Sequence, residues 1–226
     1  KTTGASDAAT VRVQRFRQGT AGSESQDFTQ LEDGRIVFSA FTGTHGREPW
    51  VTDGTGDGTT ILMNIASDGD SSNPKNFTTG SGGRFFFTAS HTDSTSELYV
   101  VNGNTVEMLK KINESGDSVV TDLYWNPNSS STLVPPIEAT LYFSANDSSE
   151  FTPNKELWKS SGIVGNAVKV KEINTNLESS SDPNGFTAIG TTVYFAATGP
   201  NLGRELYKTN GTEAGTVQVK DINNGG

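Results

Sequence analysis

Short apolar runs separated by polar turns dominate the chain. Four of these runs combine aromatic and β-branched residues, at residues 36–40, 85–89, 141–145 and 193–197. Runs of this length and composition, bounded by Gly, Asn, Asp and Ser, predict buried β-strands. Residues 167–173 and 216–222 instead alternate between apolar and polar positions, which predicts strands with one face in water.

A Glu–apolar–aromatic triplet recurs four times, and its glutamates are 49, 59 and 49 residues apart. A turn residue followed by glycine begins three positions after each aromatic. The aromatics and turn residues are Trp50, Asp53 and Gly54; Tyr99, Asn102 and Gly103; Trp158, Ser161 and Gly162; and Tyr207, Asn210 and Gly211. These turn pairs are typical of tight hairpins, which need positive φ angles. An internal period of this length predicts a propeller, a solenoid or another repeat array.

Each repeat holds four predicted strands: a short one around Phe-Thr, the apolar run, the triplet and the alternating segment. The third repeat has only Asp122-Leu123 in the first place. Four antiparallel strands in about 49 residues are typical of a propeller blade. We therefore expect an all-β protein, a β-propeller with four complete blades and a half blade, with a β-solenoid as the alternative. Equivalent core positions are expected for Phe38, Phe87, Phe143 and Phe195.

The repeat also predicts boundaries within one propeller-like domain. The complete blades are expected at residues 18–66, 67–113, 114–174 and 175–226. Residues 1–17 align with the end of the last repeat, and Phe16 precedes Ile65 by the same 49 residues. We expect this segment to be the C-terminal half of a preceding blade, in a chain that is part of a longer polypeptide. Other strands should complete it, because an open sheet edge favours aggregation.

The repeat resembles the Glu-Leu-Trp-x-x-Asp-Gly-Thr family, which occurs in tandem in large secreted or surface proteins, chiefly of bacteria. Residues 204–222 are most similar to it, whereas Pro49 replaces the leucine and Ser161-Gly162-Ile163 replaces Asp-Gly-Thr. The resemblance implies a β-propeller-like fold and an extracellular or cell-surface location, and it implies no general activity. The motif aromatics and turn residues named above are expected to be structural.

Composition excludes several classes of partner and site. The net charge is −9, from 26 acidic and 17 basic residues without a Lys/Arg cluster, which argues against binding to nucleic acid or an anionic membrane. No segment approaches the roughly 20 apolar residues of a membrane span, so we expect no membrane insertion. The absence of cysteine excludes disulfides, thiolate metal sites and cysteine nucleophiles.

Several polar residues are candidates for chemistry. Glu48, Glu97, Glu156 and Glu205, two of them preceded by Arg47 and Arg204, recur in every repeat. A catalytic residue is normally needed once, so we interpret the glutamates as structural, for instance in hydrogen bonding between blades. The two histidines, His45 and His91, are interpreted as unrelated surface residues, because no carboxylate pattern supplies a third metal ligand.

Two further segments are candidate sites. Asp68, Asp70 and Asn73 place oxygen ligands near one another, as a Ca²⁺ loop requires, but the closing bidentate Glu of an EF-hand is absent and an ordinary polar turn has the same composition. No other cofactor is predicted. The third repeat carries an insertion at 125–136, in which Trp125, Pro135 and Pro136 are candidates for ligand or partner contacts; the alternative is a disordered decoration.

The sequence favours a non-catalytic structural or adhesive module of an extracellular assembly. Its expected partners are further repeats of the same polypeptide or other protein subunits, with glycans as the alternative partner. A glycan-binding propeller, with aromatics stacking on sugars, is the alternative. A glycoside hydrolase is the third and least favoured interpretation: it would need two placed carboxylates, which the sequence does not identify and which the 26 acidic residues do not exclude.

Overall fold

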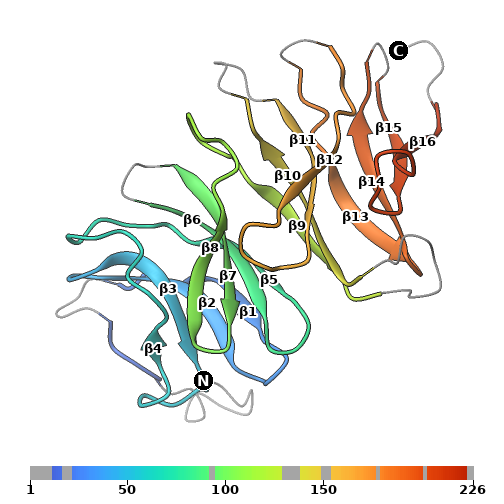
Figure 1. The fold of residues 1–226 in the computed structure, drawn as a ribbon. Coiled ribbons are helices and arrows are strands. Elements are labelled where there is room, and N and C mark those ends of the chain that lie inside the picture. The colour runs from blue at the N-terminus through green and yellow to red at the C-terminus, as the bar shows by residue number, and fades with distance from the viewer. Residues whose placement is uncertain are drawn as a thin grey trace. The chain divides into compact units, whose positions relative to one another are not determined.

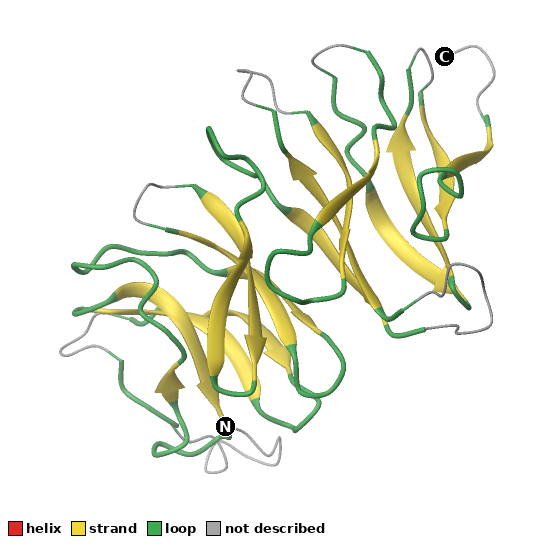
Figure 2. Cartoon of the chain, viewed as in Figure 1, coloured by secondary structure: helices red, strands yellow, loops and turns green. Residues whose placement is uncertain are grey.

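The computed structural model describes residues 12–16, 22–91, 95–128, 138–148, 154–176, 179–200 and 203–222. Within these ranges the chain forms four four-stranded antiparallel sheets (Figure 1). Figure 2 shows strands joined by loops, and no helix occurs in the described residues; none that could span a membrane is therefore found there. The prediction of an all-β propeller fold, rather than a β-solenoid, is confirmed.

The strands pair in chain order within every sheet. Blade 1 contains β1 (Gln26–Gln30), β2 (Ile36–Thr42), β3 (Gly46–Thr52) and β4 (Thr60–Ile61), and blade 2 contains β5 (Lys75–Thr79), β6 (Phe85–Ser90), β7 (Ser96–Asn102) and β8 (Thr105–Lys110). Blade 3 contains β9 (Thr121–Asn126), β10 (Thr140–Asn146), β11 (Lys155–Ser160) and β12 (Val168–Lys171), and blade 4 contains β13 (Asn184–Ile189), β14 (Thr192–Thr198), β15 (Arg204–Thr209) and β16 (Val217–Lys220). Each sheet falls inside one of the four predicted blade ranges.

Two compact units make up the chain, and each is described by itself below. The first unit contains residues 1–94 and 101–106, and the second contains residues 95–100 and 107–226. Blade 1 therefore lies in the first unit, and blades 3 and 4 lie in the second. Of the predicted half blade, residues 12–16 are described and form no strand, while residues 1–11 and 17 lie outside the described residues.

Cross-strand aromatic pairs set the register of the second and third strands. Phe38 lies opposite Trp50 in blade 1, Phe143 opposite Trp158 in blade 3, and Phe195 opposite Tyr207 in blade 4. The rings of the last pair are stacked, with centroids 5.9 Å apart. Such pairs stabilise antiparallel sheets, and they explain why the aromatic of the triplet recurs. The four predicted core phenylalanines, Phe38, Phe87, Phe143 and Phe195, are all buried, as expected.

A β-bulge repeats in the first strand of every blade and was not predicted. The pairing of first and second strands shifts register in all four sheets. One residue at the shift has positive φ in each case: Asp27 (59°), Asn76 (58°), Asp122 (58°) and Gly185 (67°). Asp, Asn and Gly adopt this conformation at low cost, so the bulge is encoded locally at this position.

Trp125 is a strand residue and does not lie in a loop, which corrects the start of the predicted insertion. β9 runs from Thr121 to Asn126, longer than the expected Asp122-Leu123 strand, and Trp125 pairs with Leu141 of β10. The remaining candidates, Pro135 and Pro136, lie outside the described residues. Their role as contact residues stays a prediction.

The hairpin glycine of blade 4 is held by both its φ angle and a neighbouring blade. Gly211 has a φ of +85°, and a Cβ added there would lie 2.8 Å from the Tyr142 hydroxyl oxygen. Gly103 has a φ of +62° with nothing within 4 Å of an added Cβ. Left-handed backbone costs an L-residue about 1–2 kcal/mol. We expect Gly211→Ala to lower the free energy of unfolding by about 2–3 kcal/mol and Gly103→Ala by about 1 kcal/mol.

Chemical denaturation of the two variants measures this difference. Gly103→Ala is the matched control, because it carries the backbone cost without the contact. Equal losses of stability in both variants would contradict a role for the Tyr142 contact.

Candidate functional site

The repeated glutamates are buried and bind the backbone of the segment that leads to the next blade. In blade 1, Glu48 accepts hydrogen bonds from the amides of Ile65 (3.0 Å), Ala66 (3.3 Å) and Ser72 (3.2 Å) and from the Ser72 hydroxyl (2.6 Å). Its side chain is therefore saturated with donors from the connection between β4 and β5. This arrangement is structural, as predicted, and leaves the carboxylate no free face for a substrate.

The same contacts recur in the second unit. Glu156 accepts from the amides of Ile173 (2.7 Å), Asn174 (3.3 Å) and Ser181 (3.2 Å) and from the Ser181 hydroxyl (2.6 Å). Glu97 accepts from the Ser118 hydroxyl at 2.6 Å. Glu205 accepts from the Ile222 amide at 2.9 Å. Glu48, Glu97 and Glu156 therefore each bind a serine of the connection to the following blade, and this contact joins consecutive blades.

Burial of these carboxyls makes stability depend on pH. Desolvation raises the pKa of Glu97 and Glu156 from 4.5 to about 7, although the hydrogen bonds from Ser118 and Ser181 oppose the shift. Desolvation also raises the pKa of Glu48. Between pH 4.5 and 7 the folded chain therefore binds more protons than the unfolded chain. The resulting stability is complete below pH 4.5 and is lost as the pH rises through 7.

We expect the free energy of unfolding to fall by on the order of 2–3 kcal/mol for each of Glu97 and Glu156 between pH 4.5 and pH 8. Denaturant titrations at a series of pH values measure this change. Glu156→Gln removes one titrating group and should flatten the profile. An identical slope in Glu156→Gln and the unchanged chain would contradict the assignment.

The glycine-bearing hairpins are stabilised internally. In blade 1, the Asp53 carboxylate accepts from the Thr55 amide (2.8 Å) and hydroxyl (2.7 Å), and the Thr52 and Thr59 hydroxyls lie 2.7 Å apart. In blade 4, the Asn210 side-chain oxygen accepts from Thr212 in the same way, and Thr209 pairs with Thr216 at 2.8 Å. The polar atoms of the motif are thus used within the turn, which indicates a structural role for Asp53 and Asn210.

The predicted calcium segment forms a tight turn. Asp68 and Gly69 have positive φ angles of 61° and 83°, and the Asp70 amide donates to the Ser67 carbonyl at 3.2 Å. The Asn73 side-chain amide donates to the Ser71 carbonyl at 3.2 Å. No group of three or more His, Cys, Asp or Glu side chains able to hold a metal ion is found in the described parts of the chain. Calcium binding by Asp68, Asp70 and Asn73 stays an untested prediction.

A pocket of about 700 Å³ lies on blade 1, on the face that carries Phe38. Phe16, Phe28 and Ile36 line it with Phe38, and Arg12 and Asp53 are among its polar residues. Phe16 makes edge contacts with Phe38 and Trp50, at centroid distances of 5.9 and 4.8 Å. The predicted half blade thus contributes Phe16 to this face. The sequence did not predict the pocket. The alignment of residues 1–17 with the last repeat does include the residues of this segment that line it.

The exposure of Phe28 shows what the pocket is. Phe28 and Phe77 hold the same position in β1 and β5, and they are 61% and 8% exposed. In blade 2 this position is covered from β1, where the Thr29 hydroxyl donates to the Phe77 carbonyl at 3.4 Å. Against the corresponding face of blade 1, the described part of the chain places Phe16. The pocket therefore leaves Phe28 without the cover that Phe77 has.

No family model and no curated protein matches the chain. Among solved structures it is similar to a puromycin hydrolase (S511A variant), with a TM-score of 0.56, 15% identity, and coverage of 90% of this chain and 30% of that one. A puromycin-hydrolyzing peptidase of Mycobacterium tuberculosis has a TM-score of 0.53 and 11% identity over 89% of this chain and 29% of that one. A gluconolactonase from Xanthomonas campestris has a TM-score of 0.46, 12% identity, and coverage of 87% and 61%.

These comparisons overturn the interpretation of the chain as a non-catalytic structural or adhesive module. That interpretation took the repeat pattern as typical of surface assemblies, whereas a puromycin hydrolase and a puromycin-hydrolyzing peptidase share the architecture. Identities of 11–15% show a shared fold alone. The chain spans about 30% of the length of the two hydrolases.

Proposed function

We propose that this chain is the β-propeller portion of a larger hydrolase, and that the reacting groups lie outside residues 1–226. The observation that carries the proposal is the match to the puromycin hydrolase, which covers 90% of this chain and only 30% of the enzyme. A propeller of this size therefore occurs within a larger hydrolytic protein. The substrate class proposed from that match is a small amide of the puromycin kind.

The hydrogen bonds of the described residues support the proposal that the reacting groups lie outside residues 1–226. The four repeated glutamates are bound to backbone amides or hydroxyls of the chain itself. His45 uses its ring Nδ1 with the Thr44 hydroxyl at 2.8 Å, on a turn of blade 1. These side chains are committed to holding turns and blade connections.

Puromycin hydrolysis by the complete gene product and by residues 1–226 alone tests the proposal. We expect turnover by the complete protein and none by residues 1–226, because the reacting groups are proposed to lie elsewhere. A panel of chromogenic aminoacyl amides extends the test beyond puromycin. Turnover by residues 1–226 alone, or a complete protein inactive on the whole panel, would reject the proposed function.

A matched pair of variants tests whether the enzyme needs the folded propeller. In the complete protein, Glu156→Ala removes the acceptor that joins blades 3 and 4, whereas Glu172→Ala changes a partly exposed carboxylate of the same blade. We expect the first variant to lose activity at a lower temperature than the second.

A further inference from the structure

The outer face of blade 3 is covered by blade 4 in the second unit. Tyr142, Leu157, Val170 and Ile173 on blade 3 are buried in one core cluster with Phe195 and Tyr207 of blade 4. Tyr124 and Phe186 add a ring contact at 6.2 Å between β9 and β13. Aromatic residues of blade 4 therefore pack against the Leu, Val and Ile side chains on the outer face of blade 3.

The same four residue types recur on the outer face of blade 4, where the Leu, Val and Ile are exposed and the Tyr is half-buried. Leu206, Val219 and Ile222 follow Leu157, Val170 and Ile173 by 49 residues each, and Tyr194 corresponds to Tyr142. Leu206, Val219 and Ile222 are 37%, 44% and 70% exposed, whereas their counterparts in blade 3 are 0%, 6% and 5% exposed. We call Tyr194, Leu206, Val219 and Ile222 the outer face of blade 4. It has the composition of a blade interface without an occupant among the described residues.

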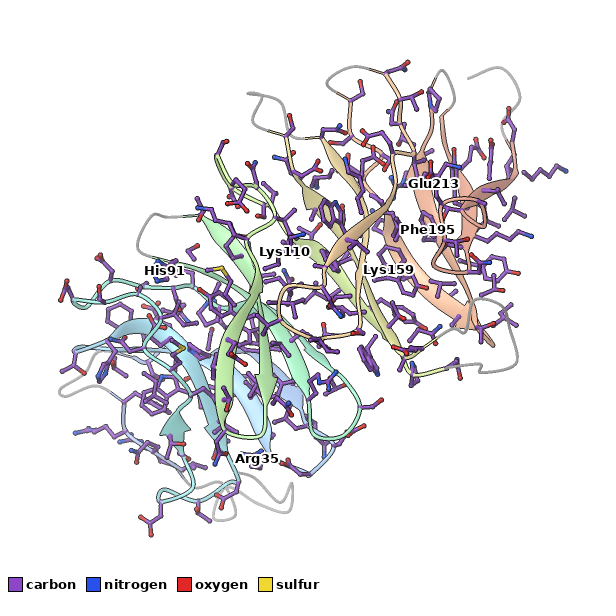
Figure 3. The ribbon with its side chains drawn as sticks, viewed as in Figure 1. Arg35, His91, Lys110, Lys159, Phe195 and Glu213 are labelled. Carbon is purple, nitrogen blue, oxygen red and sulfur yellow. The ribbon has the colours of Figure 1, made fainter. Side chains whose placement is uncertain are left out.

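A lysine at the end of the fourth strand accompanies this interface. Lys110, which is labelled in Figure 3, donates to the Ala167 carbonyl at 2.9 Å and lies 5.8 Å from the centre of the Trp158 ring. Lys171 donates to the Thr216 carbonyl at 2.8 Å. Both carbonyls belong to the segment between the third and fourth strands of the following blade. The corresponding residue of blade 4, Lys220, is exposed.

We infer that the outer face of blade 4 binds a further four-stranded blade of this repeat type. That blade presents aromatic residues at the positions of Phe186, Phe195 and Tyr207, and its hairpin carbonyl accepts from Lys220. The inference rests on the proposed function, because a further blade requires the chain to be part of a larger protein. The occupant is a blade because the equivalent residues of blade 3 are covered by one, with the same Leu, Val, Ile and Tyr beneath it.

A second copy of the chain fits the outer face less well. In that second copy, the blade with an exposed phenylalanine is blade 1, so blade 1 would have to supply the contact. Residues 12–16 already lie against that face of blade 1, where Phe16 contacts Phe38 and Trp50. A complete blade 4 from another copy would have to displace them. This argument selects an additional blade as the occupant.

Thiol labelling tests the inference, because the chain has no cysteine of its own. Val170→Cys and Val219→Cys place single thiols at equivalent positions, and we expect the Val219→Cys thiol to react at least tenfold faster. Residues 174–222 are then repeated after Ile222, which keeps the 49-residue spacing. In this extended chain the original Val219→Cys thiol should slow to the rate of Val170→Cys.

The control extension carries Asp at the added copies of Phe195 and Tyr207, and it should leave the thiol fast. A folded extension that leaves labelling of Val219→Cys fast overturns the inference. So does slow labelling in the unextended chain together with a dimer in light scattering, since the occupant would then be a second copy. If circular dichroism shows that the added blade is unfolded, a copy of residues 66–112 is used as the extension in its place. Failure of both extensions to fold also counts against the inference.

None of these labelling results depends on hydrolysis. The absence of hydrolase activity rejects the proposed function, while labelling decides the occupant of the outer face.

Discussion

Glu156→Ala is expected to lower the free energy of unfolding by about 2–6 kcal/mol at neutral pH, because it removes the acceptor of the Ile173 and Asn174 amides and leaves the Ser181 amide and hydroxyl with the Lys155 carbonyl alone. The side chain is fully buried and accepts from three backbone amides and the Ser181 hydroxyl. Alanine offers no acceptor at this fully buried position. Each buried donor left unpaired costs about 1–3 kcal/mol, with partial relaxation reducing the sum.

Glu172→Ala is the matched control for this variant. Glu172 belongs to the same blade, and its side chain is 38% exposed and pairs with Lys169 at 2.7 Å. Solvent-exposed ion pairs contribute about 0–1 kcal/mol, so the control should change stability little. Denaturant unfolding at constant pH measures both variants. Losses below about 1 kcal/mol in both would show that the glutamate is not the device that joins the blades.

The position of the glutamate could be predicted from the sequence, but its partners could only be predicted in part. The triplet repeat indicated a structural residue. The serines that donate to it lie 24, 21 and 25 residues after Glu48, Glu97 and Glu156. This uneven spacing, across a turn and an irregular connection, hides the pairing from any search at a fixed period. A serine at roughly the same distance after three of the glutamates was the available signal.

The strand order and core were predictable for a different reason. Aromatic residues at Phe38 and Trp50, and at their counterparts in later blades, must lie opposite one another to share one face of a sheet, so their spacing carries the register. The sequence did not predict the first-strand bulge, because a single Asp, Asn or Gly beside the short first strand also suits an ordinary turn. The sequence did not predict the pocket on blade 1 either. The exposure of a sheet face depends on the segment that covers it, and the residues of the face itself do not specify that segment.

The function was the part that sequence reasoning interpreted wrongly, and the reason is physical. The repeat specifies how blades hold their turns and pack on one another, through residues such as Glu48 and Asp53. These requirements are the same whether a propeller belongs to a surface assembly or to an enzyme. Fold and function are separable in this sense, so the motif could predict the architecture and not the activity.

Phe77→Ala should lower the free energy of unfolding by about 3–4 kcal/mol, whereas Phe28→Ala should lower it by about 1 kcal/mol or less. The two residues hold the same position in consecutive blades, and each contacts the core phenylalanine of its own blade, with ring centroids 5.4 Å apart for Phe77–Phe87 and 5.3 Å for Phe28–Phe38. They differ in their cover, since Phe77 is 8% exposed and Phe28 is 61% exposed. The loss on truncation should follow the apolar area removed from water.

Urea unfolding of the two variants of residues 1–226 measures this pair, and the conservative Phe77→Leu variant controls for packing at the covered site. The comparison removes most other variables, because strand, neighbour ring and local sequence are shared. A loss in Phe28→Ala as large as that in Phe77→Ala would mean that strands of the chain fill the pocket in solution. The front of blade 1 would then be a closed interface, and the pocket beside Phe16 and Phe38 would not exist in the free protein.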